Sequence, residues 1–149
     1  MSTSELGGFL ADAVTEVLET MFFTTLAGDV SPEAPGAPWI AASLSFRGAP
    51  PGRFGVRLPL TAARVIAANF LGRDEASLSG REVGEVTCEL ANILCGSLLS
   101  RFEKNTRFEL SQPAFTFEQP GGQAEDQPVR QRFELEEGPL ELWLELNPA

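Results

Sequence analysis

The sequence contains no histidine and no tyrosine, and its only cysteines are Cys88 and Cys95. Without histidine, the chain cannot form a Ser-His or Cys-His nucleophile, and it also lacks the commonest metal ligand of proteins. The two cysteines lie about 10 Å apart along the axis of one expected helix, which is too far for a disulfide between them. These absences exclude histidine-based catalysis and a local disulfide.

Positive charge is also scarce, because 11 Lys and Arg stand against 21 Asp and Glu, for a net charge of −10. Nucleic acids and anionic membrane surfaces reward clustered Lys and Arg, so we expect neither as a partner. The sequence shows no apolar run of membrane-spanning length and no signal peptide, and we expect no membrane insertion. Together with two free thiols, these features favour the reducing cytoplasm.

The chain of 149 residues has the size of one ordinary domain, and we expect a single domain over residues 1–149. Three segments have the spacing of amphipathic helices. They cover residues 4–23, 61–70 and 79–102. Thr61 is expected to cap the second helix and Gly72 to stop it, and the third begins with a capping-box signature, Ser79 and Glu82.

Six further segments alternate apolar and polar residues, as strands with one buried face do. They cover residues 40–46, 54–58, 107–110, 113–117, 129–135 and 140–146. Turns are predicted at 49–52 and at Gly138-Pro139, and loops at 27–38 and 119–128. This order of helix, strands, helices and strands predicts an α+β fold in which an antiparallel β-sheet packs with long α-helices.

The third helix carries a polar stripe within the stretch GEVTCELANILCG. Its members follow one another at i, i+4, i+7 and i+11, on one side of the helix. They are Glu85, Glu89, Asn92 and Gly96. Gly96 costs the helix roughly 0.5 to 1 kcal/mol relative to Ala, which is easier to understand where another group comes close. The alternative is that the stripe is only the solvated outer face of a half-buried helix.

Apolar residues occupy the other sides of this helix. Those expected to face the core are Val83, Val86, Leu90, Ile93, Leu94 and Leu98. Cys88, Cys95 and Leu99 flank the stripe and give it an apolar margin, which resembles a docking surface. The alternative is that the chain's own sheet or another helix covers this margin.

The stripe resembles a known motif. Glu85-x-x-x-Glu89-x-x-Asn92 is similar to the motif of the CheC/CheX family of chemotaxis phosphatases, in which an acidic residue or Ser precedes ExxN. A proline follows the family motif at a distance, as Pro113 does here. Residues 17–21, VLETM, resemble the opening helix of CheX proteins, and the order of elements is similar over nearly the whole chain.

The resemblance implies a function, which is hydrolysis of the aspartyl phosphate of a CheY-like response regulator. Asn92 would position the attacking water, and Glu89 would pair with a lysine of the phosphorylated regulator. The residues expected to contact this partner are Glu85, Cys88, Gly96 and Leu99. We expect no cofactor or metal bound by this chain, and Mg²⁺ in the regulator, because the sequence has no cluster of loop carboxylates. The resemblance further implies a homodimer.

Two other functions stay open on the sequence alone. One is a binding module that recognises or sequesters a regulator without hydrolysis, and the other is a dimeric structural protein that associates through sheet edges. The presence of Asn92 favours the phosphatase, because an apolar residue there would have favoured the binding module. We expect one site per chain, since the first helix has Glu16 and Glu19 where the motif has Glu89 and Asn92.

Overall fold

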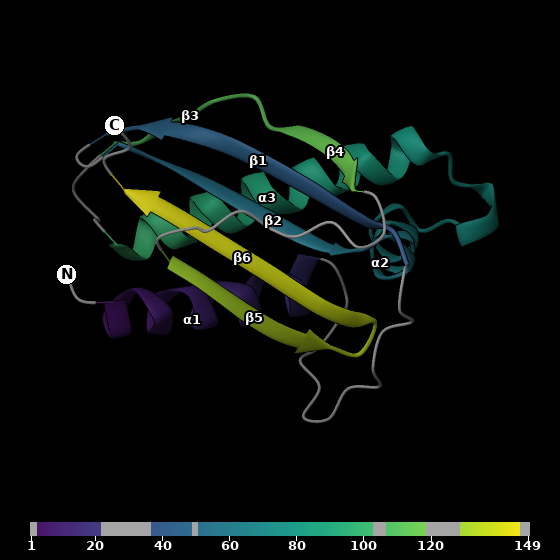
Figure 1. The fold of residues 1–149 in the computed structure, drawn as a ribbon, viewed down its shortest axis with the longest axis horizontal. Helices are drawn as coiled ribbons and strands as arrows, with labels where there is room; N and C mark the ends of the chain where they lie inside the picture. The colour runs from purple at the N-terminus through teal and green to yellow at the C-terminus, as the bar shows by residue number, and fades with distance from the viewer. Residues whose placement is uncertain (1–2, 22–36, 49–50, 103–106, 119–128, 147–149) are drawn as a thin grey trace.

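A computed structural model describes residues 3–21, 37–48, 51–102, 107–118 and 129–146 of the chain. Its helices are α1 (Thr3–Met21), α2 (Leu60–Leu71) and α3 (Gly80–Phe102), with a short 3-10 helix, η1 (Glu75–Ser77). Its strands are β1 (Trp39–Arg47), β2 (Gly52–Pro59), β3 (Glu109–Leu110), β4 (Ala114–Glu118), β5 (Val129–Leu135) and β6 (Gly138–Leu146). The predicted α+β fold with an antiparallel sheet is confirmed (Figure 1).

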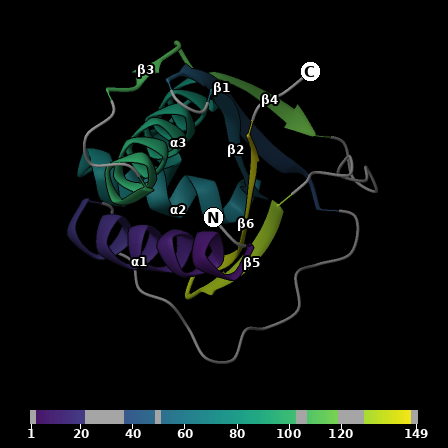
Figure 2. The same ribbon diagram turned by 90° about the vertical axis from the view of Figure 1, so that its left-hand side faces the viewer.

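All described strands belong to one antiparallel sheet, in the order β3-β1-β2-β6-β5. β4 also pairs with β1, so β3 and β4 share one edge of the sheet. Figure 2 shows α1, α2 and α3 together on one face of this sheet. The fold therefore has two layers over the part that is described, helices on one side and the sheet on the other.

Alternate residues of the strands form the core beneath the helices. The buried strand residues include Ile40, Ala42, Leu44, Phe46, Phe54, Val56, Leu58, Leu140, Leu142 and Leu144. The side of α3 predicted to face the core does so: Val83, Val86, Leu90, Leu94 and Leu98 are buried and Ile93 is partly buried. Each fully buried Leu or Val contributes about 1.5 to 3 kcal/mol relative to exposure. One side of α3 is thereby fixed to the sheet, which leaves its other side available for function.

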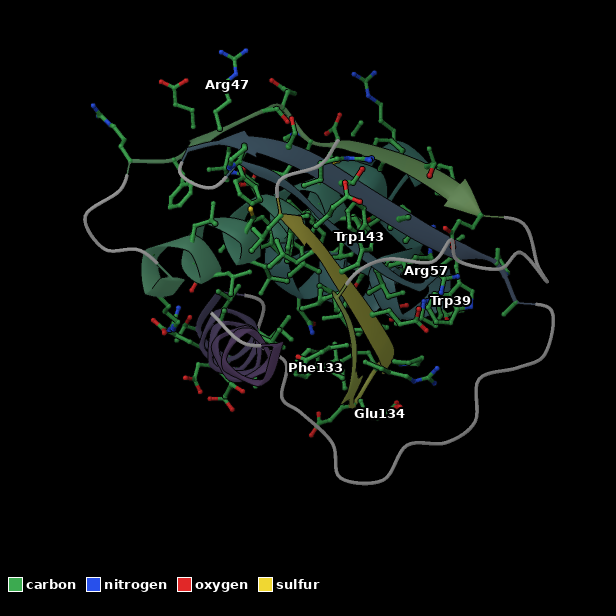
Figure 3. The ribbon with its side chains drawn as sticks, turned by 60° about the vertical axis from the view of Figure 1, so that its left-hand side comes forward. Trp39, Arg47, Arg57, Phe133, Glu134 and Trp143 are labelled. Atoms are coloured by element: carbon green, nitrogen blue, oxygen red, sulfur yellow. The ribbon has the colours of Figure 1, made fainter. Side chains whose placement is uncertain are left out.

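The face of the sheet away from the helices carries an ion-pair network around Arg57, which Figure 3 labels together with Trp39. Arg57 of β2 is 12% exposed, and its guanidinium pairs with Glu118 of β4 at 2.8 Å and with Glu141 of β6 at 2.7 Å. The same guanidinium lies 4.2 Å from the ring centroid of Trp39 on β1. Arg57 therefore ties the edge strand β4 to the centre of the sheet.

A capping box begins α3, as predicted. The Ser79 N–H donates to Glu82 Oε1 at 3.0 Å, and the Glu82 N–H donates to Ser79 Oγ at 3.1 Å. The hydrogen bond from the Ser79 backbone, and then the Arg73 guanidinium, hold the pKa of the Glu82 carboxyl below its ordinary value. The Glu82 contribution to stability is therefore present near neutral pH and is lost as pH falls through that lowered pKa.

The ends of α2 agree with the sequence only in part. Gly72 stops the helix in the left-handed region, with φ 66°, as predicted. The prediction that Thr61 caps the helix is wrong, because α2 already begins at Leu60 and Pro59 occupies the cap position without a side-chain cap. The Leu60 N–H instead donates to the Pro38 carbonyl at 3.0 Å, so a neighbouring segment satisfies the helix start.

The predicted strands are found with shifted ends. The prediction for 107–110 overestimates β3, which pairs with β1 only over Glu109–Leu110. The loop at 119–128 and most of the loop at 27–38 lie outside the described residues, as do positions 22 and 23 of the first predicted helix. Within the described ranges, no helix is both long enough and apolar enough to cross a membrane.

We predict that Ser79→Ala lowers the free energy of unfolding by about 1 kcal/mol, because it leaves the Glu82 N–H without its acceptor at the start of α3. Urea denaturation followed by circular dichroism measures the change. Ser100→Ala is the matched control, an exposed serine in the last turn of α3 that should change stability by less than about 0.5 kcal/mol. Equal losses in the two variants would contradict the role of the capping box.

Candidate functional site

A groove of about 750 Å³ lies between α3 and the segment that runs from β3 into β4. On one wall, α3 contributes Glu85, Cys88, Glu89 and Asn92. On the other wall lie Leu110, Ser111, Gln112, Pro113, Ala114 and Phe115. Five residues that the sequence singled out, three of the stripe together with Cys88 and Pro113, therefore line one cavity although they come from two separate segments.

The α3 wall is open to solvent at its polar positions. Glu85 and Glu89 are exposed, and Asn92 is half-buried. The Glu85 carboxylate accepts a hydrogen bond from the Arg81 guanidinium at 3.0 Å, one turn earlier on the exposed surface of the helix. Within the described part of the chain, the side chains of Glu89 and Asn92 make no hydrogen bond or ion pair. A carboxylate and an amide one turn apart are thus available to a partner.

The opposite wall is a β-bulge formed by residues 111–113. The pairing with β1 runs from Leu110 opposite Phe46 to Ala114 opposite Ser43, so three residues face two residues of β1. A bulge interrupts the ladder and redirects the side chains around it. The interruption separates β3 from β4 and turns the bulge toward the groove.

Two hydrogen bonds hold the bulge against β1. The Ser111 N–H donates to the Ser45 carbonyl at 2.8 Å, and the Ser45 N–H donates to Ser111 Oγ at 2.9 Å. Pro113 is half-buried at the end of the bulge, where its missing N–H breaks no ladder bond. The sequence pointed to Pro113 only through a family resemblance and did not reveal Ser111 or Gln112, because a bulge depends on the register between strands.

The expected apolar margin of the stripe is wrong at two of its three positions. Leu99 is 3% exposed and Cys95 0%, and both belong to the hydrophobic core. The alternative, that the chain's own elements cover this margin, is correct for these two residues. Cys88 is the exception, because it is half-buried and lines the groove.

Gly96 shows no close approach in the described structure. A Cβ at this position would meet no atom of the described residues within 4 Å, so the expected crowding is not found. The close approach on α3 occurs instead at Gly84, which is buried beneath the Phe115 ring of β4. Gly96 lies outside the residues that line the groove.

The thiols of the helix are poorly suited to nucleophilic chemistry. Burial, and then the carboxylates of Glu85 and Glu89, raise the pKa of the Cys88 thiol. Burial raises the pKa of Cys95 to about 12. Both thiols therefore stay protonated at neutral pH, and a protonated thiol is a weak nucleophile.

The first helix does not duplicate the groove. Glu16, which aligns with Glu89 when the two helices are overlaid, forms an ion pair with Arg101 at the other end of α3. That contact joins α1 to α3 instead of leaving the Glu16 carboxylate free. In the described residues, the arrangement of a free carboxylate and a free amide is therefore found on α3 and not at the corresponding positions of α1.

Comparisons with known proteins bear on this groove. The family described as Chemotaxis phosphatase CheX matches residues 40–133, a range that contains both walls. No curated protein gives a significant match.

Solved structures share the fold at low sequence identity. A chemotaxis protein CheX from Desulfovibrio desulfuricans has a TM-score of 0.74 and 16% identity, over 96% of this chain and 99% of that one. CheX from Vibrio vulnificus has a TM-score of 0.72 and 17% identity, over 99% of both chains. A CheX-CheY-BeF3-Mg²⁺ complex from Borrelia burgdorferi matches with a TM-score of 0.69 and 14% identity, over 96% of this chain and 98% of that one. Because the family match spans more than half of the sequence, this chain belongs to the CheX family of chemotaxis phosphatases.

Proposed function

We propose that this chain hydrolyses the aspartyl phosphate of a CheY-like response regulator, with Glu89 and Asn92 of α3 entering the active site of the regulator. The observation that carries the proposal is the pair of unengaged side chains on one wall of the groove. Family membership supports the reaction. The structural similarity to a CheX that was solved with CheY, BeF3 and Mg²⁺ supports the partner.

In the proposed reaction, a water attacks the phosphorus atom and the bond between phosphorus and the aspartyl oxygen breaks. Inorganic phosphate and the free aspartate carboxylate are released. Phosphoryl transfer passes through a loose transition state, so the reaction depends on placing the water in line more than on a strong base. The Asn92 carbonyl can accept a hydrogen bond from this water without adding negative charge beside the phosphoryl group. This role suits a chain without histidine.

Glu89 has a different part in the proposal. It lies three residues before Asn92, on the same side of α3. We assign it to an ion pair with the regulator's lysine that the family resemblance implies. Such a pair fixes the depth and the rotation at which α3 enters the partner, and so determines where the Asn92 amide lies.

Mg²⁺ belongs to the regulator in this proposal. The described residues include no group of three His, Cys, Asp or Glu side chains placed to hold a metal ion. In this proposal the chain supplies an amide and a carboxylate to a site whose phosphoryl group, metal and lysine come from the partner. The homodimer implied by the resemblance stays a prediction.

We predict that Asn92→Ala slows the decay of a phosphorylated receiver domain about 10²-fold, close to 2.7 kcal/mol, because the water loses its hydrogen-bonding partner. The measurement is single-turnover decay with the variant in saturating excess and Mg²⁺ present, which removes differences in affinity. Asn92→Asp should be severely impaired as well, since its carboxylate repels the phosphoryl group. A general-base mechanism predicts an active Asp variant instead.

Asn69→Ala is the control for this experiment, because Asn69 is an exposed helical asparagine of α2 that does not line the groove. With Asn69→Ala, the phosphorylated receiver should decay at the same rate as with the parent protein. A folded Asn92→Ala variant with undiminished activity would rule out the role of the amide. A parent protein that binds the phosphorylated receiver without accelerating its decay would identify a binding module and not a phosphatase.

We predict that Glu89→Lys weakens binding of the phosphorylated regulator by about 2 kcal/mol or more, roughly 30-fold in Kd, because a lysine would oppose the regulator's lysine. Titration of a labelled receiver domain measures the affinity. Glu19→Lys makes the same charge change at an exposed position of α1 and should alter the affinity much less. Equal losses would mean that Glu89 contributes only to the overall charge.

A further inference from the structure

A contact between α3 and β4 lies beside the groove. The Phe115 ring of β4 packs over Gly84 of α3, and both residues come from the elements that form the walls. A Cβ placed on Gly84 would lie within 3.0 Å of three atoms of this ring, a separation that real Cβ atoms essentially never show. The bare Cα of Gly84 therefore permits the present distance between α3 and β4.

The position of Gly84 on the helix links this contact to the groove. Gly84, Cys88 and Asn92 follow one another at intervals of four residues, so they lie along nearly the same side of α3. Glu85, the first groove residue of the helix, is the next residue in the chain. A shift of α3 at Gly84 would therefore move the wall that carries the amide and the carboxylates.

Phe115 is linked in the same way to the other wall. It lies two residues after Pro113 and lines the groove itself. Its ring also packs edge-on against Phe117, with ring centroids 5.7 Å apart, and its backbone pairs with Ala42 of β1. A methyl group on Gly84 would therefore have to displace this ring, and with it the part of the groove wall that the ring forms.

We propose that Gly84 is a positioning residue, and that its contact with Phe115 sets the distance between α3 and the bulge at which the groove fits its partner. The consequence for catalysis rests on the proposed phosphatase function, whereas the consequence for the geometry of the groove does not. A glycine in a helix interior costs roughly 0.5 to 1 kcal/mol relative to alanine, and this contact gives a physical reason for retaining it.

The test compares Gly84→Ala with Gly8→Ala. Both substitutions add one methyl group to a helix and raise helix propensity, but Gly8 is an exposed residue of α1, where a methyl meets no described atom within 4 Å. Gly84→Ala should slow single-turnover decay of the phosphorylated receiver about tenfold, since misplacement by about 1 Å can cost up to 10²-fold. Gly8→Ala should retain the parent rate.

A double variant separates the contact from general destabilisation. Phe115→Leu removes the ring atoms that the new methyl would strike, so Gly84→Ala should have little further effect in that background. With the double variant, the phosphorylated receiver is expected to lose its phosphate at the same rate as with Phe115→Leu alone. If the fold-changes in decay rate of the two single variants instead multiply in the double variant, the two residues do not act through one contact, and the proposal is overturned.

Cys88 provides a readout that does not require activity. It lines the groove, whereas Cys95 is buried in the core, so alkylation by N-ethylmaleimide reports the opening of the groove at Cys88. Gly84→Ala should raise the Cys88 labelling rate about threefold by separating the walls, and Gly8→Ala should not change it. Equal labelling rates in these two variants would overturn the proposal even if the parent protein had no phosphatase activity.

Two further outcomes are decisive. If the parent protein accelerates no decay, the proposed function fails while the labelling comparison still decides whether Gly84 sets the groove. If Gly84→Ala does not fold, Phe115→Leu alone carries the test, because removal of the ring should raise Cys88 labelling and slow decay. Parent-like labelling and decay in folded Phe115→Leu would overturn the proposal.

Discussion

The helices α1, α2 and α3 lie on the same face of one antiparallel sheet. Burial of the apolar side of α3 against that face fixes the rotation of the helix about its axis, and therefore decides which residues can reach a partner. The edge of the sheet beside α3 is formed by two short strands separated by a bulge. The groove exists because the long helix is held firmly on one side and faces an interrupted edge on the other.

The groove contains several polar groups, but their environments restrict what each can do. The raised pKa of the Cys88 thiol keeps it protonated, and Glu85 is engaged by Arg81 on the surface. The carboxylate of Glu89 and the amide of Asn92 are left to meet a partner. An amide orients water without the charge that a carboxylate would bring, so the arrangement is suited to completing an active site whose charges are already supplied by another protein.

Much of the fold could be predicted from the sequence, because helix and strand periodicities are local signals. The capping box at Ser79 and the stop at Gly72 depend on neighbouring residues and were found in the structure as predicted. The cap of α2 was not, since a backbone carbonyl far along the chain, that of Pro38, accepts the first helical N–H. The helical stripe placed Glu85, Glu89 and Asn92 correctly on one wall, because helix geometry alone determines their side.

The remainder of the site depends on tertiary contacts that no periodicity contains. Leu99 and Cys95 are apolar, as residues of a docking surface often are, yet both are buried in the hydrophobic core. The bulge that presents Pro113 and Gln112 arises from the register between β1 and two later strands. The close approach was expected at Gly96 and occurs at Gly84, because only the position of Phe115 in space distinguishes the two glycines.

The central place of β2 in the sheet has a consequence for how the chain is assembled during synthesis. β2 pairs with β1 through a short connection, but its other edge pairs with β6, where Gly52 lies opposite Leu146. Until β6 is made, the edge of β2 that lies away from the groove has no strand to pair with. Closing so long a loop is slow compared with forming a hairpin, so β6 pairs with β2 later than β1 does. The groove lies at the opposite edge of the sheet, between α3 and the strands β3 and β4, so neither of its walls belongs to the late-forming hairpin of β5 and β6.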